Sequence, residues 1–262
     1  MSEIEFFDML IDTHAHIYSE DFIHDVDEVL QRAYDNDVKK IMLPNIDSGS
    51  VKRLLDLADA YPHLCYPLMG LHPTSVAADY HEELEAVEYW LEKRKFYGIG
   101  EIGIDLYWDR SFLKEQQDAF RHQIKLAKSN QLPIVIHLRE SFDETYSIVK
   151  EEQDGNLRGI FHCFTGNKEE AQKITDLGFT LGIGGVVTFK NSNLPDVLKN
   201  VSLKNLVIET DAPYLTPMPK RGKRNESAYL VYVAQAVAKI YDISVNEVAE
   251  ITTDNARNLF GI

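Results

Sequence analysis

The sequence is poor in cysteine and has no long hydrophobic run. Its two cysteines, Cys65 and Cys163, are too few among 262 residues for a disulfide framework. No apolar run approaches the roughly 20 residues needed to span a bilayer. Residues 1–5 are acidic where a secretory signal would be basic. We therefore expect a protein of the reducing cytoplasm without a membrane segment.

Basic residues are also scarce relative to acidic ones. The chain has 27 Lys and Arg against 42 Asp and Glu, a formal net charge of −15. Such a charge weakens nonspecific binding of nucleic acid at long range, which argues against a DNA scaffold protein. It argues less against an enzyme that holds a phosphate locally, because bound dications can dominate the field inside a cleft.

Eight short apolar or β-branched runs alternate with longer amphipathic segments. The intervening segments carry apolar residues at helical spacing, as in Val51, Leu54, Leu55 and Ala58. Strand alternating with helix predicts a parallel sheet. Eight such units predict a closed (β/α)8 TIM barrel, formed as one domain over residues 1–262. The predicted strands are residues 9–12, 40–43, 64–69, 97–104, 133–136, 159–161, 179–183 and 206–208.

The last part of the chain adds a loop and a helix. Residues 213–222, rich in Pro, Gly and basic residues, follow the eighth predicted strand, so we interpret them as a loop at the barrel mouth. Ser244 and Glu247 have the spacing of a capping box, which predicts a final helix running towards Asn258.

Residues that can bind a metal stand at the ends of five predicted strands. Side chains at i and i+2 of a strand point to one face, so His14 and His16 could bind one ion. A lone histidine pair is more often surface or satisfied core, but the carboxyl ends of barrel strands converge. Four histidines and two acids there are enough for two ions, which is typical of a hydrolase. The six candidates are His14, His16, Glu101, His137, His162 and Asp211.

Six sequence blocks carry a family resemblance. They are DTHAH at 12–16, GLHP at 70–73, GEIGID at 100–105, HLR at 137–139, HCFTG at 162–166 and ETDAP at 209–213. In this order they resemble the signature blocks of TatD-family metal-dependent deoxyribonucleases. The resemblance implies an amidohydrolase-type barrel with a two-metal centre that hydrolyses phosphodiester bonds in DNA, often from a 3′ end.

The resemblance also implies roles for the six candidates. It implies that the first ion is held by His14, His16 and Asp211, the second by His137 and His162, with Glu101 as the bridge. A carboxylate can span two ions roughly 3.5–4 Å apart. Asp211 would orient the attacking water and take its proton, so Asp211 and Glu101 are the catalytic candidates. Magnesium, manganese, zinc and nickel all remain open as the metal.

Further residues could bind substrate or orient ligands. His72 could donate to a phosphate or to the leaving alkoxide, or could be a turn histidine satisfied by backbone. Arg139 could pair with phosphate or close a structural salt bridge. Asp12 and Glu209 could accept the second N–H of a ligating imidazole, or could pair with a core arginine or lysine.

Two groups of residues after predicted strands could contact DNA. The one concentrated basic cluster is Lys220, Arg221, Lys223 and Arg224; such charge runs are usually solvated, but its position favours contact with DNA. Tyr107 and Trp108 could stack on bases, although aromatic residues near a barrel rim are more often packing.

Two other functions remain open. The same metal platform could serve an amide, lactone or carboxyl-ester hydrolase, because fold and metals do not determine the substrate. A non-catalytic binding protein could use the metals for stability, although structural zinc sites are usually closed by four protein ligands. Arg139 and the basic cluster favour DNA, single-stranded or at 3′ ends, and nothing indicates an obligate protein partner.

Overall fold

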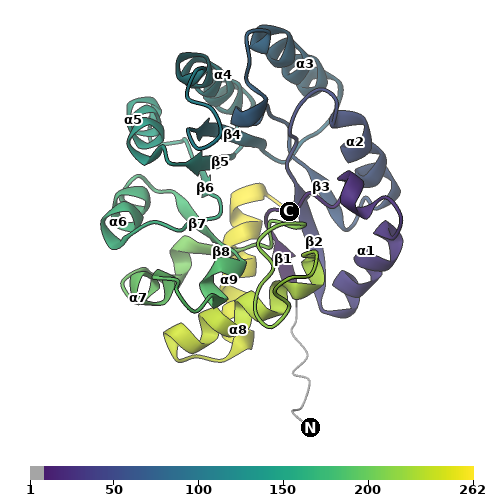
Figure 1. The fold of residues 1–262 in the computed structure, drawn as a ribbon, viewed down its shortest axis with the longest axis vertical. Coiled ribbons are helices and arrows are strands. Elements are labelled where there is room, and N and C mark those ends of the chain that lie inside the picture. The colour runs from purple at the N-terminus through teal and green to yellow at the C-terminus, as the bar shows by residue number, and fades with distance from the viewer. Residues whose placement is uncertain (1–8) are drawn as a thin grey trace.

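Eight parallel strands form a ring that is surrounded by helices in the computed structural model, which describes residues 9–262 (Figure 1). The strands are β1 (Leu10–Asp12), β2 (Val38–Leu43), β3 (Cys65–Pro67), β4 (Ile99–Asp105), β5 (Ile134–Arg139), β6 (Gly159–Phe161), β7 (Thr180–Ile183) and β8 (Leu206–Ile208). The helices are α1 (Val26–Asp35), α2 (Val51–Ala60), α3 (Tyr80–Lys93), α4 (Leu113–Asn130), α5 (Phe142–Glu152), α6 (Lys168–Asp176), α7 (Leu194–Leu198), α8 (Leu230–Tyr241) and α9 (Val245–Phe260).

Two bridges close the ring of strands. Regular pairing gives a three-stranded sheet, β1–β2–β3, and a five-stranded sheet, β4 to β8. Met69 bridges to Ile99 and Ala15 bridges to Ala212, both in parallel, which joins the two sheets at both edges. The predicted (β/α)8 barrel is confirmed. One domain over the full chain stays a prediction, and the acidic residues 1–5 lie outside the described residues.

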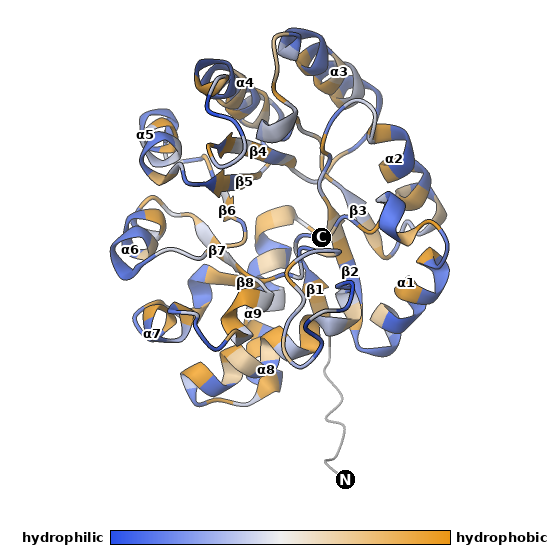
Figure 2. Ribbon diagram, viewed as in Figure 1, coloured by the Kyte–Doolittle hydropathy of each residue, from blue (hydrophilic) through white to orange (hydrophobic). Residues whose placement is uncertain are grey.

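The outer helices turn their apolar faces to the strands, as the orange sides in Figure 2 show. This arrangement is the one that the helical spacing of apolar residues predicts. Along residues 9–262, no helix is both long and apolar enough to cross a lipid bilayer.

The final helix closes the end of the barrel opposite the site described below. Helix α9 begins with the predicted capping box of Ser244 and Glu247 and lies behind the strands in Figure 1. Its side chains Leu259 and Phe260 pack among inward-facing strand residues such as Val135. The helix therefore takes the place of a layer of barrel core.

Two of the candidate ligands lie at other positions in their strands than the sequence predicts. Glu101 was expected at a strand end, but β4 runs on to Asp105, so Glu101 is its third residue. His137 lies inside β5, which continues to Arg139. The expectation that both end their strands is wrong, because β4 and β5 pair as far as Asp105 and Arg139.

Phe260→Ala should test the role of α9. The ring is 6% exposed, and its removal leaves a cavity that α9 and the strands cannot fill. We expect the free energy of unfolding in urea to fall by about 3–5 kcal/mol. Tyr89→Ala, at a 53% exposed side chain, should change it by less than about 0.5 kcal/mol. Equal effects of the two substitutions would contradict the packing role.

Candidate metal centre

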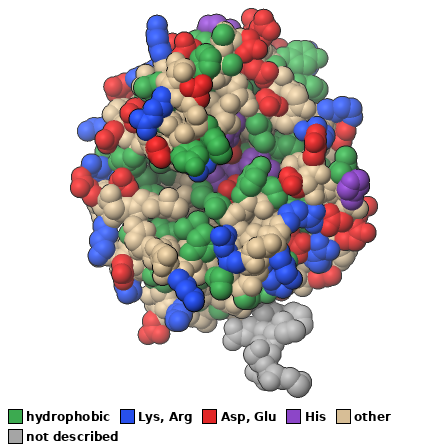
Figure 3. Space-filling view, viewed as in Figure 1, with side chains coloured by type: hydrophobic (Ala, Val, Ile, Leu, Met, Phe, Trp, Pro, Cys, Tyr) green, Lys and Arg blue, Asp and Glu red, His purple; other side chains and the backbone are tan. Residues whose placement is uncertain are grey.

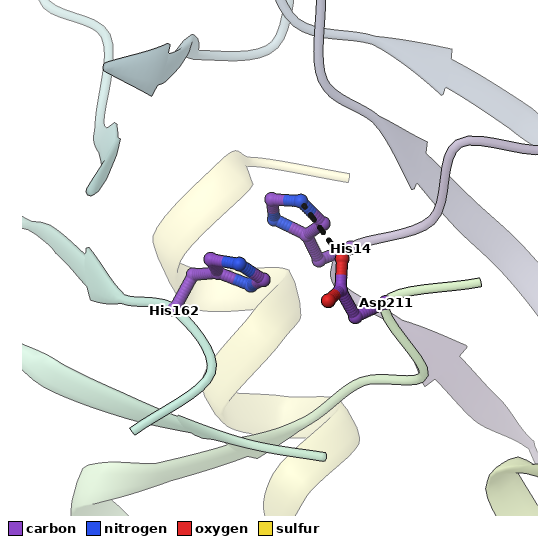
Figure 4. A group of neighbouring side chains, drawn as sticks. All are labelled: His14, His162 and Asp211. Atoms are coloured by element: carbon purple, nitrogen blue, oxygen red, sulfur yellow. Dashed lines mark ion pairs between the residues drawn. The ribbon is translucent and has the colours of Figure 1, made fainter. Parts of the chain in front are cut away.

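The six predicted ligands converge at the carboxyl ends of the strands. His14 Nε2 lies 3.2 Å from His16 Nε2 and 3.1 Å from a Glu101 oxygen. Figure 3 shows histidine side chains at the bottom of a hollow in the centre of this face. Figure 4 shows His162 and Asp211 on either side of His14. His137 Nδ1 lies 2.7 Å from Glu101 Oε1.

The backbone after β1 holds His14 and His16 on one side. Although β1 ends at Asp12, Ala15 N–H donates to the carbonyl of Met42, and His16 N–H donates to that of Ala212. These bonds continue the extended pairing beyond the strand. The two imidazoles therefore approach each other, as the i, i+2 spacing predicts.

Glu101 connects two groups of histidines. Its Oε2 lies 3.1 Å and 3.5 Å from the Nε2 atoms of His14 and His16, and its Oε1 faces His137 and His162. The carboxylate is buried. Burial would raise its pKa, but the adjacent histidines, first His72 and then His14, hold the pKa well below its usual range. An ionised carboxylate with each oxygen facing a different group has the geometry of a bridging ligand.

Hydrogen bonds fix the tautomers of His162 and His16. His162 Nδ1 lies 2.9 Å from Glu209, so it donates to that carboxylate, as predicted for Glu209. The Tyr18 hydroxyl donates to the Pro44 carbonyl at 2.5 Å, so it accepts from His16 Nδ1 at 3.2 Å. In the neutral form of either ring the lone pair then lies on Nε2, the atom that a metal would bind.

Asp105 is a functional residue that sequence reasoning missed. Its Oδ2 lies 2.9 Å from His137 Nε2, and its Oδ1 accepts from the backbone N–H of Tyr107 at 3.0 Å. Burial would lower the pKa of His137, but Asp105 and Glu101 outweigh it and raise the pKa. Asp105 therefore orients the ring with Nδ1 towards Glu101.

Same-face alternation could have revealed Asp105. It follows Glu101 by four positions in β4, and alternate side chains of a strand face the same side. Tyr18 was also missed, and it lies in a turn, where no such alternation applies.

Asp12 does not support the His14 ring, so that prediction is wrong. Its carboxylate accepts from the backbone N–H of Thr210 at 2.9 Å and from the Thr210 hydroxyl at 2.6 Å. It also accepts from the backbone N–H of His14, not from the ring. The buried Nδ1 of His14 has no partner among residues 9–262. Asp12 thus joins the first and last strand ends instead.

Asp211 is the more exposed of the two carboxylates among the six candidate ligands, with 13% of its side chain accessible against 3% for Glu101. Burial raises its pKa to about 6, although His162 and His16 oppose the shift. A carboxylate at the open side of the cluster with a raised pKa can accept a proton near neutral pH.

His72 is oriented as a hydrogen-bond donor. Its Nδ1 accepts from the backbone N–H of Thr74 at 3.1 Å, which excludes a proton on Nδ1. Nε2 then carries the hydrogen in the neutral ring and faces Glu101 Oε1 at 3.4 Å. The pKa of His72 is lowered, mainly by burial, so the ring stays neutral. His72 is close enough to Glu101 and His137 to form a metal group, but its tautomer favours donation over ligation.

Arg139 lies at the rim without a carboxylate partner. Its guanidinium stacks 3.6 Å above the Tyr107 ring and 5.5 Å from that of Trp108. Since it forms no ion pair within residues 9–262, the alternative of a structural salt bridge is wrong.

Part of the basic cluster serves the fold. Arg224 forms a two-pronged ion pair with Asp25, which ties the segment after β8 to the residue before α1. Arg221 lies over the Phe189 ring at 4.3 Å, and Lys220 lies 5.3 Å from the ring centre of Tyr229. Lys223 is exposed. Arg224 is therefore not available to a substrate, whereas Lys220, Arg221 and Lys223 form no ion pair among residues 9–262.

The donor set fits divalent cations. Three groups of donor atoms lie within 4.8 Å of one another: His14, His16 and Glu101; His14, His162 and Asp211; and His72, Glu101 and His137. Burial lowers the pKa of His14 to about 3, so its ring is neutral and can donate a lone pair. Mixed imidazole and carboxylate ligation suits zinc, manganese or nickel.

Comparison with known proteins agrees with this geometry. The family model described as "TatD related DNase" matches residues 11–261. The "uncharacterized metal-dependent hydrolase YabD" of Bacillus subtilis is 40% identical, over 97% of this chain and 100% of that protein. The "3'-5' ssDNA/RNA exonuclease TatD" of Citrobacter rodentium is 31% identical, over 97% and 98%.

Solved structures show the same relationship. The crystal structure of the TatD homologue YjjV from Escherichia coli has a TM-score of 0.90 and 31% identity, with 97% of this chain and 98% of that chain covered. A phosphotriesterase homology protein of Escherichia coli, at 13% identity and a TM-score of 0.69, shares the fold. The chain belongs to the TatD-related DNase family and is a metal-dependent hydrolase.

Proposed function

We propose that the protein is a two-metal phosphodiesterase that removes nucleotides from single-stranded DNA or from 3′ ends. The observation that carries the proposal is Glu101, whose two oxygens face different histidine groups. That arrangement provides for two adjacent ions that share one carboxylate, as phosphodiester hydrolysis uses.

The chain's residues divide between holding the ions and moving protons. One ion would be held by His14, His16 and Asp211 and the other by His137 and His162, with Glu101 shared. Bound dications would lower the pKa of water and polarise the phosphoryl oxygens. Asp211 accepts the proton of the attacking water, since it is the carboxylate nearest the opening.

His72 assists the leaving group. Its Nε2–H faces the cluster, and its neutral state is maintained by burial. The ring can therefore donate a hydrogen bond to the leaving oxygen or to a phosphoryl oxygen without adding charge.

The rim favours a phosphodiester over an amide, lactone or carboxyl ester. A phosphodiester backbone needs cations beyond the ions, and Arg139, Lys220 and Arg221 supply them. The name of the Citrobacter relative points the same way. A purely structural role for the metals is disfavoured, because Asp211 leaves the cluster partly open to solvent, whereas structural sites are closed.

Release of nucleotides from end-labelled single-stranded DNA by metal-loaded protein tests the activity. Glu101→Ala should reduce release to background because both ions lose a ligand. Direct measurement of bound metal should show fewer ions per chain in this variant. Tyr34→Ala, at an exposed side chain far from the ligands in sequence, serves as the control. Full activity in Glu101→Ala would indicate a contaminating nuclease, and turnover of esters or amides without turnover of DNA would support the rival hydrolase.

Asp105→Asn should weaken metal binding. The carboxamide cannot supply the negative charge that orients His137. Loss of such a partner typically lowers metal affinity by about 10- to 100-fold. Calorimetric titration with Mn²⁺ measures this affinity. Asp109→Asn, at an exposed carboxylate in the following loop, should leave it unchanged. Unchanged affinity in Asp105→Asn would refute the orienting role.

His72→Ala should separate donation from ligation. We expect kcat on DNA to fall by about 10²–10⁴-fold while the number of bound metal ions stays the same. A 4-nitrophenyl phosphodiester, whose leaving group needs no proton, should show a much smaller loss if His72 protonates the leaving oxygen. Loss of one bound ion would instead identify His72 as a ligand.

A further inference from the structure

A pocket of about 260 Å³ lies beside the metal centre, between the loops that follow β5 and β6. His162 forms part of its wall, so the pocket adjoins the ligand cluster. The apolar part of the lining is Leu138, Phe142 and Phe164. No residue proposed above for substrate binding lies in it.

The lining selects against phosphate. No Lys or Arg lines the pocket, whereas the carboxylates of Glu140 and Glu170 do. A phosphate would be repelled by these groups and attracted to any dications that His162 and its neighbours would hold. A substrate that spans both places must therefore put its charged part at the metals and an uncharged part into the pocket.

The walls are rigid before any ligand binds. A Cβ at Gly166 would collide with the Phe164 ring and with the Glu170 carboxylate, so this turn packs without space to spare. Glu170 is fixed by the backbone N–H of Asn167 in a capping box that begins α6. On the opposite side, the Ser141 hydroxyl donates to the Ile104 carbonyl at 2.6 Å. A preformed site costs little ordering when a planar group enters.

We propose that this pocket binds the nucleobase of the nucleotide next to the scissile phosphate. The inference rests on the proposed phosphodiesterase function and adds a base-binding subsite to it. Aromatic side chains bind bases by stacking, which accepts any base because every base has a π face. Phe142 is only partly buried, and one face of its ring stacks on Tyr146 with 5.6 Å between the ring centroids, so a base would stack on the opposite face.

Paired oligonucleotides test the proposal. One is ordinary single-stranded DNA, and the other carries an abasic tetrahydrofuran residue in place of the nucleotide to be released. Wild-type protein should cleave the ordinary end with a kcat/KM about 5- to 100-fold higher. Phe142→Ala should lose most of this preference by slowing only the ordinary substrate, whereas Phe142→Leu should keep part of it. Tyr89→Ala, an exposed aromatic on α3, is the matched control and should preserve the full ratio.

The outcomes separate this inference from the proposed function. Equal kcat/KM values for the two ends in wild-type protein, with DNA cleaved, would overturn the base subsite and leave the phosphodiesterase standing. If metal-loaded protein cleaves neither end, the proposed function fails, and binding of free deoxyadenosine by saturation-transfer NMR decides the subsite. Binding that is lost in Phe142→Ala supports the pocket, and no binding to wild type overturns it.

Discussion

The site depends on burial of the Glu101 carboxylate among imidazoles. Glu101 is 2% exposed, and within residues 9–262 no Lys or Arg forms an ion pair with it. A buried carboxylate without compensation is very costly, so this position requires positive charge from imidazolium protons or metal ions. Burial would lower the pKa of His162, but Glu209 and Glu101 outweigh it and raise the pKa to about 10. The buried carboxylate of Glu101 needs positive charge beside it, and bound dications would supply that charge.

The barrel meets this demand by close approach of strands. Gly103 in β4, with φ of 144°, lies where a Cβ would collide with the backbone carbonyl of His137, so any other residue would push β5 away. Gly182 in β7 makes room for Glu209 in the same way. A Cβ at Gly182 would collide with the Glu209 carboxylate. These glycines bring the ligands and their partners within hydrogen-bond distance. Among the six candidate ligands, Glu101 and His137 are therefore held by the sheet itself, whereas the other four follow the last residue of their strands.

Most of this arrangement could be predicted, because it follows from periodicity. The strand pattern predicts the barrel, and the carboxyl-end rule brings the six ligands together from distant parts of the chain. Register is less predictable: whether Glu101 ends a strand depends on how far β4 pairs with β5. Pairing of individual charges is less predictable still. Asp12 contacts Thr210 and not the His14 ring, and Arg224 is committed to Asp25, since both partnerships depend on loop paths that no local pattern encodes.

The charge distribution limits what this face can hold. With a net charge of −15, the surface as a whole repels a long polyanion, and Arg224 is already paired. The cations left at the rim, Arg139, Lys220, Arg221 and Lys223, could contact few phosphates at once. Each phosphate contact adds to affinity and to its salt dependence, so few contacts mean a short bound segment. A substrate held by its terminal phosphate at the metals needs no extended cationic track. For the phosphodiesterase proposed above, these charges favour an end of a single strand over the interior of a duplex.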